Sequence, residues 1–149
     1  MIELKKRLSS ILEGKHENRD EKLKKVCHLL DQEISYFNWT GFYFRNGDKE
    51  ELVLGPYVGA ATDHVVIPFG KGICGQVAVS NQTFVVADVS QQDNYLSCSM
   101  DTKSEIVVPI MKDGKNIGQI DIDSHQIDPF TEKDQELLEW LCAEVAKQM

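Results

Sequence analysis

Apolar residues recur at helical spacing near both ends of the chain. From Asn18 onward they stand three, one, three and four residues apart, which places them on one helical face (Leu23, Val26, Cys27, Leu30 and Ile34). Toward the other end, Thr131 and Asp134 suit a helix start, and a second apolar stripe follows them (Leu137, Leu138, Leu141, Cys142 and Val145). The pattern predicts a helical N-terminal segment over about 1–36 and a C-terminal helix over about 131–148.

Between these helices, short apolar runs alternate with turn residues. Asn46-Gly47 and Asp113-Gly114 each join two such runs and predict hairpins. A glycine-rich turn opens a short helix after residue 70, and 90–104 has no period and predicts a long loop. The predicted strands are 38–44, 51–57, 64–69, 83–89, 105–112 and 116–123. We therefore expect one α+β domain over 1–149, with an antiparallel sheet and its loop over about 38–124 and the N- and C-terminal helices packed on one face.

The last predicted strand carries acidic residues on one side only. In IGQIDIDS, residues 120 and 122 are isoleucines that face one way, while Asp121 and Asp123 face the other. The two aspartates suit a solvated sheet face, but pairing across the hairpin also brings Glu105 close to them. Three carboxylates without a basic neighbour favour a cation, and no calcium loop is present, so a ligand ammonium fits best.

Two aromatic residues add an apolar wall on another predicted strand. Trp39 and Tyr43 are four residues apart and share a strand face. Either Trp39 is simply core and Tyr43 a partly exposed strand residue, or the two rings line a pocket. An aromatic wall, an acid cluster and a thiol together suit a small, zwitterionic, sulfur-bearing ligand.

The four cysteines have no CxxC pair and no zinc-ligand spacing, so no metal site is expected. Cys27 and Cys142 lie in helical stripes and are predicted to be core. Cys98 lies in the polar loop segment YLSCSMD, where it is either an incidental exposed thiol or a functional one. The match of Gly70–Gly75 to GxGxxG is attributed to chance, because Pro68 and hairpins surround it, and no cofactor is expected.

Composition narrows the classes of partner. The 149 residues are 42% hydrophobic, which suffices for a core, and the net charge of -8 is spread along the chain and argues against nucleic acid binding. No apolar run approaches the roughly 20 residues of a membrane span, and the first ten residues lack the apolar core of a signal peptide. We expect a cytoplasmic protein that does not bind membranes.

Short motifs follow one another between Asn38 and Phe130: NWTGFYF, ELVLGPYVG, IPFGKGICG, VVADV, the cysteine loop, KSEIVVPI, KDGKNIG and DIDS. Together they resemble the free methionine-R-sulfoxide reductases, which are single GAF domains. The resemblance implies a GAF-like fold and thioredoxin as the reductant. It also implies these roles: Cys98 as nucleophile, Cys74 as resolving cysteine, Glu105, Asp121 and Asp123 as substrate ligands, and Trp39 and Tyr43 as pocket lining. The family usually has a further cysteine ten residues before the cysteine of GICG, and this sequence has His64 at that position.

The chemistry of sulfoxide reduction fits these residue types. A thiolate attacks sulfur while an acid protonates the departing oxygen, which leaves a cysteine sulfenic acid. Glu105 or one of the aspartates is a candidate for that acid, since crowding by like charges raises one carboxyl pKa. Cys74, the only other cysteine outside a helical stripe, or an external thiol would then resolve the sulfenic acid.

Two other interpretations stay open. One is a non-catalytic GAF module that binds a small ligand and regulates a partner, and the other is a dimerisation domain with an incidental surface thiol. A homodimer formed through the helices is compatible with the enzyme and with the regulatory module.

Overall fold

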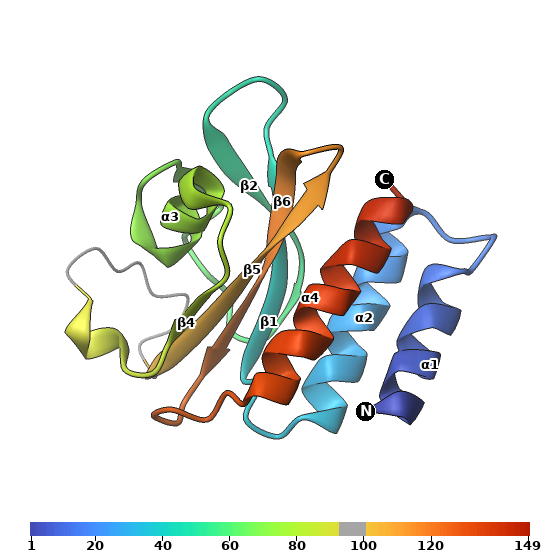
Figure 1. Ribbon diagram of the computed structural model, residues 1–149, viewed down its shortest axis with the longest axis horizontal. Helices are drawn as coiled ribbons and strands as arrows, with labels where there is room; N and C mark the ends of the chain where they lie inside the picture. The colour runs from blue at the N-terminus through green and yellow to red at the C-terminus, as the bar shows by residue number, and fades with distance from the viewer. Residues whose placement is uncertain (93–100) are drawn as a thin grey trace.

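The centre of the molecule is a six-stranded sheet whose neighbouring strands are all antiparallel (Figure 1). The computed structural model describes residues 1–92 and 101–149. The spatial order is β3-β2-β1-β6-β5-β4, so the first and last long hairpins meet at the centre through β1 and β6. The strands are β1 Trp39–Arg45, β2 Glu51–Val58, β3 Val66–Pro68, β4 Phe84–Val86, β5 Ser104–Lys112 and β6 Lys115–Ser124.

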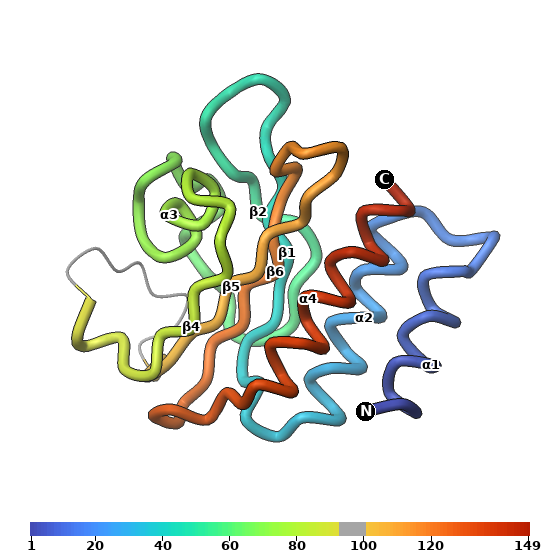
Figure 2. Tube along the Cα trace, viewed as in Figure 1, coloured from blue at the N-terminus to red at the C-terminus, as the bar shows by residue number. Residues whose placement is uncertain are grey.

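Helices cover the two faces of this sheet unequally. Both views show α1, α2 and α4 together on one face and α3 on the other (Figures 1 and 2). The helices are α1 Ile2–Leu12, α2 Arg19–Glu33, α3 Gly72–Ser80 and α4 Glu132–Lys147. The predicted α+β fold, with the N- and C-terminal helices on one face, is therefore confirmed. None of the helices in the described part of the chain is long and apolar enough to span a membrane.

The helix boundaries follow local capping. The Asn18 side chain accepts a hydrogen bond from the Glu21 amide at 2.9 Å, so the predicted N-terminal helical segment consists of two helices, with α2 starting after Asn18. At α4, Thr131 Oγ1 accepts from the Asp134 amide and Asp134 Oδ2 accepts from the Thr131 amide, which is a capping box. Tyr36 also donates to Asp134 Oδ2 at 2.7 Å and ties the start of α4 to the segment before β1.

The strand predictions hold in the hairpins, but both edge strands are shorter than predicted, and the one predicted over 64–69 spans only Val66–Pro68. Gly47, Asp113 and Gly114 have positive φ, as tight turns require, and the hairpins form where predicted. The strand predicted over 83–89 ends at Val86 instead. Asp88 accepts hydrogen bonds from the amide and hydroxyl of Ser90, which caps a short 3₁₀ turn over Val89–Gln91.

Alternation along the strands divides the core in two. One half, under α1, α2 and α4, is aliphatic and aromatic, and its sheet residues include Phe42, Ile106, Ile120 and Ile122. The other half, under α3, contains Trp39, Tyr43, Ile73, Cys74 and Val107. The candidate site lies in this second half.

Candidate functional site

Three carboxylic side chains meet on the sheet face that α3 covers. Glu105 on β5 pairs with Asp123 on β6, and Asp121 pairs with Val107, so the hairpin register points all three side chains the same way. Glu105 is 2% exposed, and Asp121 and Asp123 are each 1% exposed. The structure brings them together as the hairpin predicted, and the interpretation of the two aspartates as a solvated strand face is wrong.

Burial decides the charge state of this cluster. Loss of solvent, followed by the charges and hydrogen bonds of Asp121 and Asp123, raises the pKa of Glu105 well above its usual range. The raised pKa favours the neutral, protonated form of Glu105 beside the two aspartates. This separation of roles resembles acid–base pairs whose surroundings push their pKa values apart.

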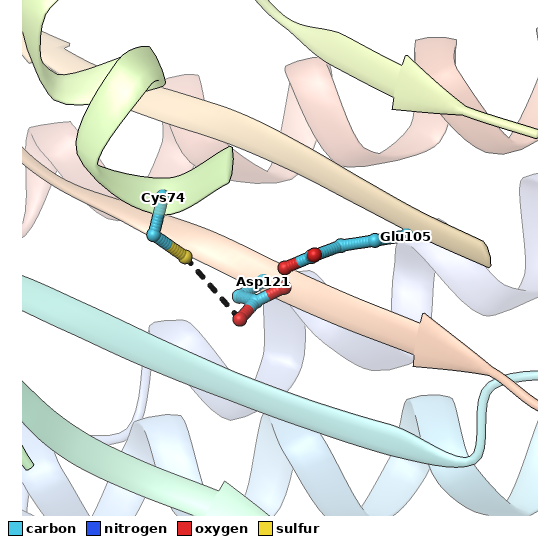
Figure 3. A group of neighbouring side chains, drawn as sticks. All are labelled: Cys74, Glu105 and Asp121. Atoms are coloured by element: carbon cyan, nitrogen blue, oxygen red, sulfur yellow. Dashed lines mark hydrogen bonds between the residues drawn. The ribbon is translucent and has the colours of Figure 1, made fainter. Parts of the chain in front are cut away.

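Cys74 reaches the same cluster from the opposite direction. It lies in the first turn of α3, is 4% exposed, and its thiol donates to Asp121 Oδ2 at 3.3 Å (Figure 3). The neighbouring Gly75 lets the start of α3 pack against the end of β3, because a Cβ added there would lie 2.7 Å from the Pro68 carbonyl oxygen. Gln119 Nε2 donates to the Cys74 carbonyl at 2.8 Å and fixes the start of α3 on the sheet.

An aromatic wall stands beside the acids. The rings of Trp39 and Tyr43 stack with centroids 6.4 Å apart, and Tyr57 of β2 stacks on Trp39 at 5.3 Å. Trp39 lies over Gly41, where an added Cβ would come within 2.5 Å of the indole. Tyr43 is completely buried, so its interpretation as a partly exposed strand residue is wrong.

Hydrogen bonds hold both rings in place. Trp39 Nε1 donates to the Ala60 carbonyl and Tyr43 Oη to the His64 carbonyl, each at 2.9 Å. The segment that connects β2 to β3 is thus fastened to the wall by its backbone. His64 contributes its carbonyl oxygen to this contact.

Two of the other cysteines are core residues, as predicted. Cys27 and Cys142 are buried in the helix-side core and donate to the carbonyls of Pro56 and Val108. Burial raises the pKa of both thiols, which makes them poor nucleophiles. Cys98, the predicted nucleophile, lies outside the described residues.

The glycine motif at Gly70–Gly75 serves a turn. Gly70 and Gly72 have φ of +89° and +63°, and they lead from β3 into α3. Because β3 pairs with β2 in the antiparallel direction, no parallel strand-helix-strand unit surrounds the motif. The attribution of the GxGxxG match to chance agrees with this topology.

Two site residues were not found from the sequence. Gln119 shares the strand face of Asp121 and Asp123, so the alternation that placed the two aspartates on this face could also have placed Gln119 there. Tyr57 faces Gly41 across the β1–β2 pair only because the register shifts between Gly41 and Tyr43, so the hairpin turn did not indicate it.

Comparison with known proteins agrees with the fold. Residues 20–149 match the GAF domain family. A free methionine-R-sulfoxide reductase of Saccharomyces cerevisiae is 43% identical over 124 residues, which are 82% of this chain and 68% of that protein. One from Escherichia coli is 38% identical over 125 residues, 84% of this chain and 74% of that protein. The chain belongs to the free methionine-R-sulfoxide reductase family.

Solved structures of free methionine-R-sulfoxide reductases have the same fold. The enzyme of Staphylococcus aureus in its reduced form superposes with a TM-score of 0.88 at 41% identity, over 97% of this chain and 92% of that one. The enzyme of Neisseria meningitidis in complex with its substrate gives a TM-score of 0.88 at 34% identity, over 95% of this chain and 83% of that one. The buried acids and aromatic wall of the present chain thus stand on a scaffold shared with substrate-binding relatives.

Proposed function

We propose that this protein is an oxidoreductase that reduces free methionine-R-sulfoxide to methionine. The observation that carries the proposal is the buried face on which Glu105, Asp121 and Asp123 meet the Cys74 thiol beside Trp39 and Tyr43. Membership of a family of free methionine-R-sulfoxide reductases supports the choice of substrate and of the R epimer.

The substrate ammonium binds between the aspartates. Asp121 and Asp123 lie in a space from which water is excluded, beside Glu105, whose raised pKa favours its neutral form. A free amino acid brings one ammonium group, which offsets negative charge on the aspartates and donates hydrogen bonds to their oxygens. A peptide-bound methionine sulfoxide has no such ammonium, which gives a physical reason for preference for the free amino acid.

The sulfur end of the substrate lies against the aromatic wall. Trp39 and Tyr43 provide apolar surface for the methyl and methylene groups. Cys98 attacks the sulfoxide sulfur as a thiolate, and Glu105 gives its proton to the departing oxygen. The sulfoxide gains two electrons and leaves as methionine, while the Cys98 sulfur loses two and becomes a sulfenic acid.

Cys74 completes the cycle. Its thiol attacks the sulfenic sulfur of Cys98, a disulfide forms, and the oxygen leaves as water. The Asp121 carboxylate, which accepts a hydrogen bond from Cys74, is placed to take the thiol proton. Thioredoxin then reduces the disulfide by thiol exchange; in a variant scheme, an external thiol resolves Cys98 directly.

Turnover of the separate sulfoxide epimers tests the proposal. Wild type should reduce the R epimer with a thioredoxin system and with dithiothreitol, and Cys98→Ser should be inactive with both. Cys74→Ser should retain activity with dithiothreitol and lose it with thioredoxin. Cys142→Ser is the matched control, since a hydroxyl can keep the hydrogen bond to the Val108 carbonyl, and it should behave as wild type.

Two results would overturn these assignments. Absence of activity in wild type with either epimer would end the reductase proposal and favour a ligand-binding GAF module. Full thioredoxin-dependent activity in Cys74→Ser would remove Cys74 from the cycle. N-acetylmethionine sulfoxide, which lacks the ammonium, should be a much poorer substrate if the aspartates bind that group.

A further inference from the structure

One thiol and two carboxyl groups lie within reach of a single ion on the α3 side of the sheet. Cys74 Sγ and one oxygen each from Glu105 and Asp121 are all within 4.8 Å of one another, and all three residues are buried (Figure 3). They come from α3, β5 and β6, so no spacing in the sequence indicates the group. We propose that this cluster binds one thiophilic divalent cation, zinc by preference, and that the bound ion blocks sulfoxide reduction.

The distances are close to those of a zinc site. Tetrahedral zinc with a sulfur ligand at about 2.3 Å and an oxygen ligand at about 2.0 Å separates the two by about 3.5 Å. Cys74 Sγ and Asp121 Oδ2 are already 3.3 Å apart. The third ligand needs to move inward by no more than roughly 1–2 Å, which a carboxyl side chain achieves by rotation.

A buried oxygen points to a missing ligand at this position. Glu105 Oε1 has no hydrogen-bond partner among residues 1–92 and 101–149, and the residue is only 2% exposed. Its carboxyl group is directed toward Asp121 (Figure 3). Because a buried polar atom without a partner costs free energy, a cation between these groups would offset that cost.

The donor set selects the class of metal. Magnesium and calcium prefer oxygen ligands and disfavour sulfur, whereas zinc takes cysteine, aspartate and glutamate together. A Cys74 thiolate and the Asp121 carboxylate balance the two positive charges, Glu105 adds an oxygen, and the thiol proton leaves to solvent. The hydrogen bond from Gln119 to the Cys74 carbonyl orients the sulfur ligand from outside the site.

Binding of the ion would remove groups that turnover needs. The same thiol is the proposed resolving group, and the same carboxyl groups are the proposed acid and ammonium ligand. Zinc occupancy and sulfoxide turnover are therefore mutually exclusive. This second half of the inference rests on the proposed function, while the binding half does not.

Cobalt(II) tests binding without any assay of activity. Cys98→Ser protein, kept free of oxygen, is titrated with Co²⁺, so that the loop thiol cannot contribute a sulfur ligand. We expect a near-ultraviolet sulfur-to-cobalt absorption that saturates at one equivalent and disappears on addition of one equivalent of zinc, which binds more tightly. Absence of this absorption, or its persistence after zinc addition, would contradict the proposal.

Three variants in the same background locate the ligands. Cys74→Ser should abolish the sulfur-to-cobalt absorption. Glu105→Gln should weaken cobalt binding at least about tenfold, since loss of an outer-sphere partner alone costs that much. Cys142→Ser, a buried cysteine in the other half of the core, should bind as the parent does. An absorption that survives Cys74→Ser, or unchanged affinity in Glu105→Gln, would overturn the ligand assignment.

A single-turnover experiment tests the exclusion of substrate. Pre-reduced wild type is mixed with one equivalent of free methionine-R-sulfoxide, with or without one equivalent of zinc, and the methionine formed is measured. No thiol is added, because an added thiol would bind the metal. Zinc should prevent methionine formation, and a chelator should restore it. Methionine formation by zinc-loaded protein would refute the exclusion. Absence of methionine without zinc would refute the proposed function instead, and would leave the cobalt result standing.

Discussion

Ile122 and Asp123 are neighbours on β6, and each is at most 1% exposed, yet they belong to two different kinds of interior. Ile122 packs among aliphatic side chains beneath the helices. Asp123 faces Glu105 and shares its side of the sheet with Asp121. The helix-side half stabilises the fold by removing apolar area from water. The site-side half keeps acidic groups out of water, which opposes folding; in the proposed function, the same burial prepares them for a cationic ligand.

The largest effect is expected on the helix side. Ile122→Ala should lower the free energy of unfolding by about 2–5 kcal/mol, because it leaves a cavity at a fully buried position. Urea unfolding followed by circular dichroism measures this change. Val79→Ala is the control; Val79 is 63% exposed, so its change should stay within about 0.5 kcal/mol. Equal effects at the two positions would contradict the assigned core.

A slightly smaller effect is expected on substrate binding. Asp123→Asn removes a charge that the proposed function assigns to the substrate ammonium, so KM should rise by roughly 10- to 100-fold, as for a lost charged hydrogen bond. The free energy of unfolding should not fall, since a buried charge is also removed. Steady-state kinetics and urea unfolding of the same preparation separate the two results. Asp48→Asn, in the exposed β1–β2 turn, should leave both quantities unchanged; an unaltered KM in Asp123→Asn would return Asp123 to a purely structural role.

Glu105→Gln should act in opposite directions on stability and activity. Burial beside two aspartates raises the pKa of Glu105, so keeping this carboxyl group in the folded protein costs free energy at neutral pH. An amide does not ionise and avoids that cost, so the free energy of unfolding should rise by about 1 kcal/mol. The amide cannot donate the proton that the proposed reaction needs, so kcat should fall. Thermal unfolding and single-turnover methionine release measure the two changes. Exposed Glu139→Gln should alter neither, and a loss of stability in Glu105→Gln would show that the carboxyl group is stabilising as it stands.

The smallest effect is expected at the edge of the helix layer. Burial, and then the Asp134 carboxylate that accepts its hydrogen bond, raise the pKa of Tyr36 to about 12. The pKa in the unfolded chain is about 10, so the native state favours the neutral phenol. The contribution of Tyr36 to the free energy of unfolding is complete below pH 10 and is lost as the pH rises through 12.

Tyr36→Phe isolates this contribution. The variant should lose less than about 1 kcal/mol at neutral pH, because the hydrogen bond is partly exposed to solvent. Between pH 10 and 12, wild type should lose stability faster than the variant. Parallel pH profiles of the unfolding free energy for the two proteins would contradict the role given to the Tyr36–Asp134 hydrogen bond.

Local patterns predicted the elements that depend on local forces. The helix start at Thr131, the turns at Gly47 and Gly114, and the helical stripes all rest on interactions within a few residues, and each is present. The strand over 83–89 was predicted too long. There, one side-chain cap by Asp88 prevailed over a run of β-favouring residues.

The candidate site was predicted in part because its acids lie on one hairpin. The turn at Asp113-Gly114 brings Glu105 near Asp121 and Asp123, as predicted, but a register shift between Ile110 and Met111 is what places Glu105 directly opposite Asp123. Cys74 and Asp121 are far apart in the sequence, because β4 and β5 lie between them. Their contact therefore depends on how α3 packs onto the sheet. Sequence motifs named Cys74 through family resemblance, but they carried no information on this geometry.

Alternation along single strands showed in advance which side chains share a face: Asp121 with Asp123, Trp39 with Tyr43, and the isoleucines of β6 on the reverse. It did not show that α3 closes over the acidic face, that burial there raises the pKa of Glu105, or that the Cys74 thiol donates to Asp121. The physical reason is that alternation is a property of one strand, whereas burial and pKa depend on what distant segments bring to its surface.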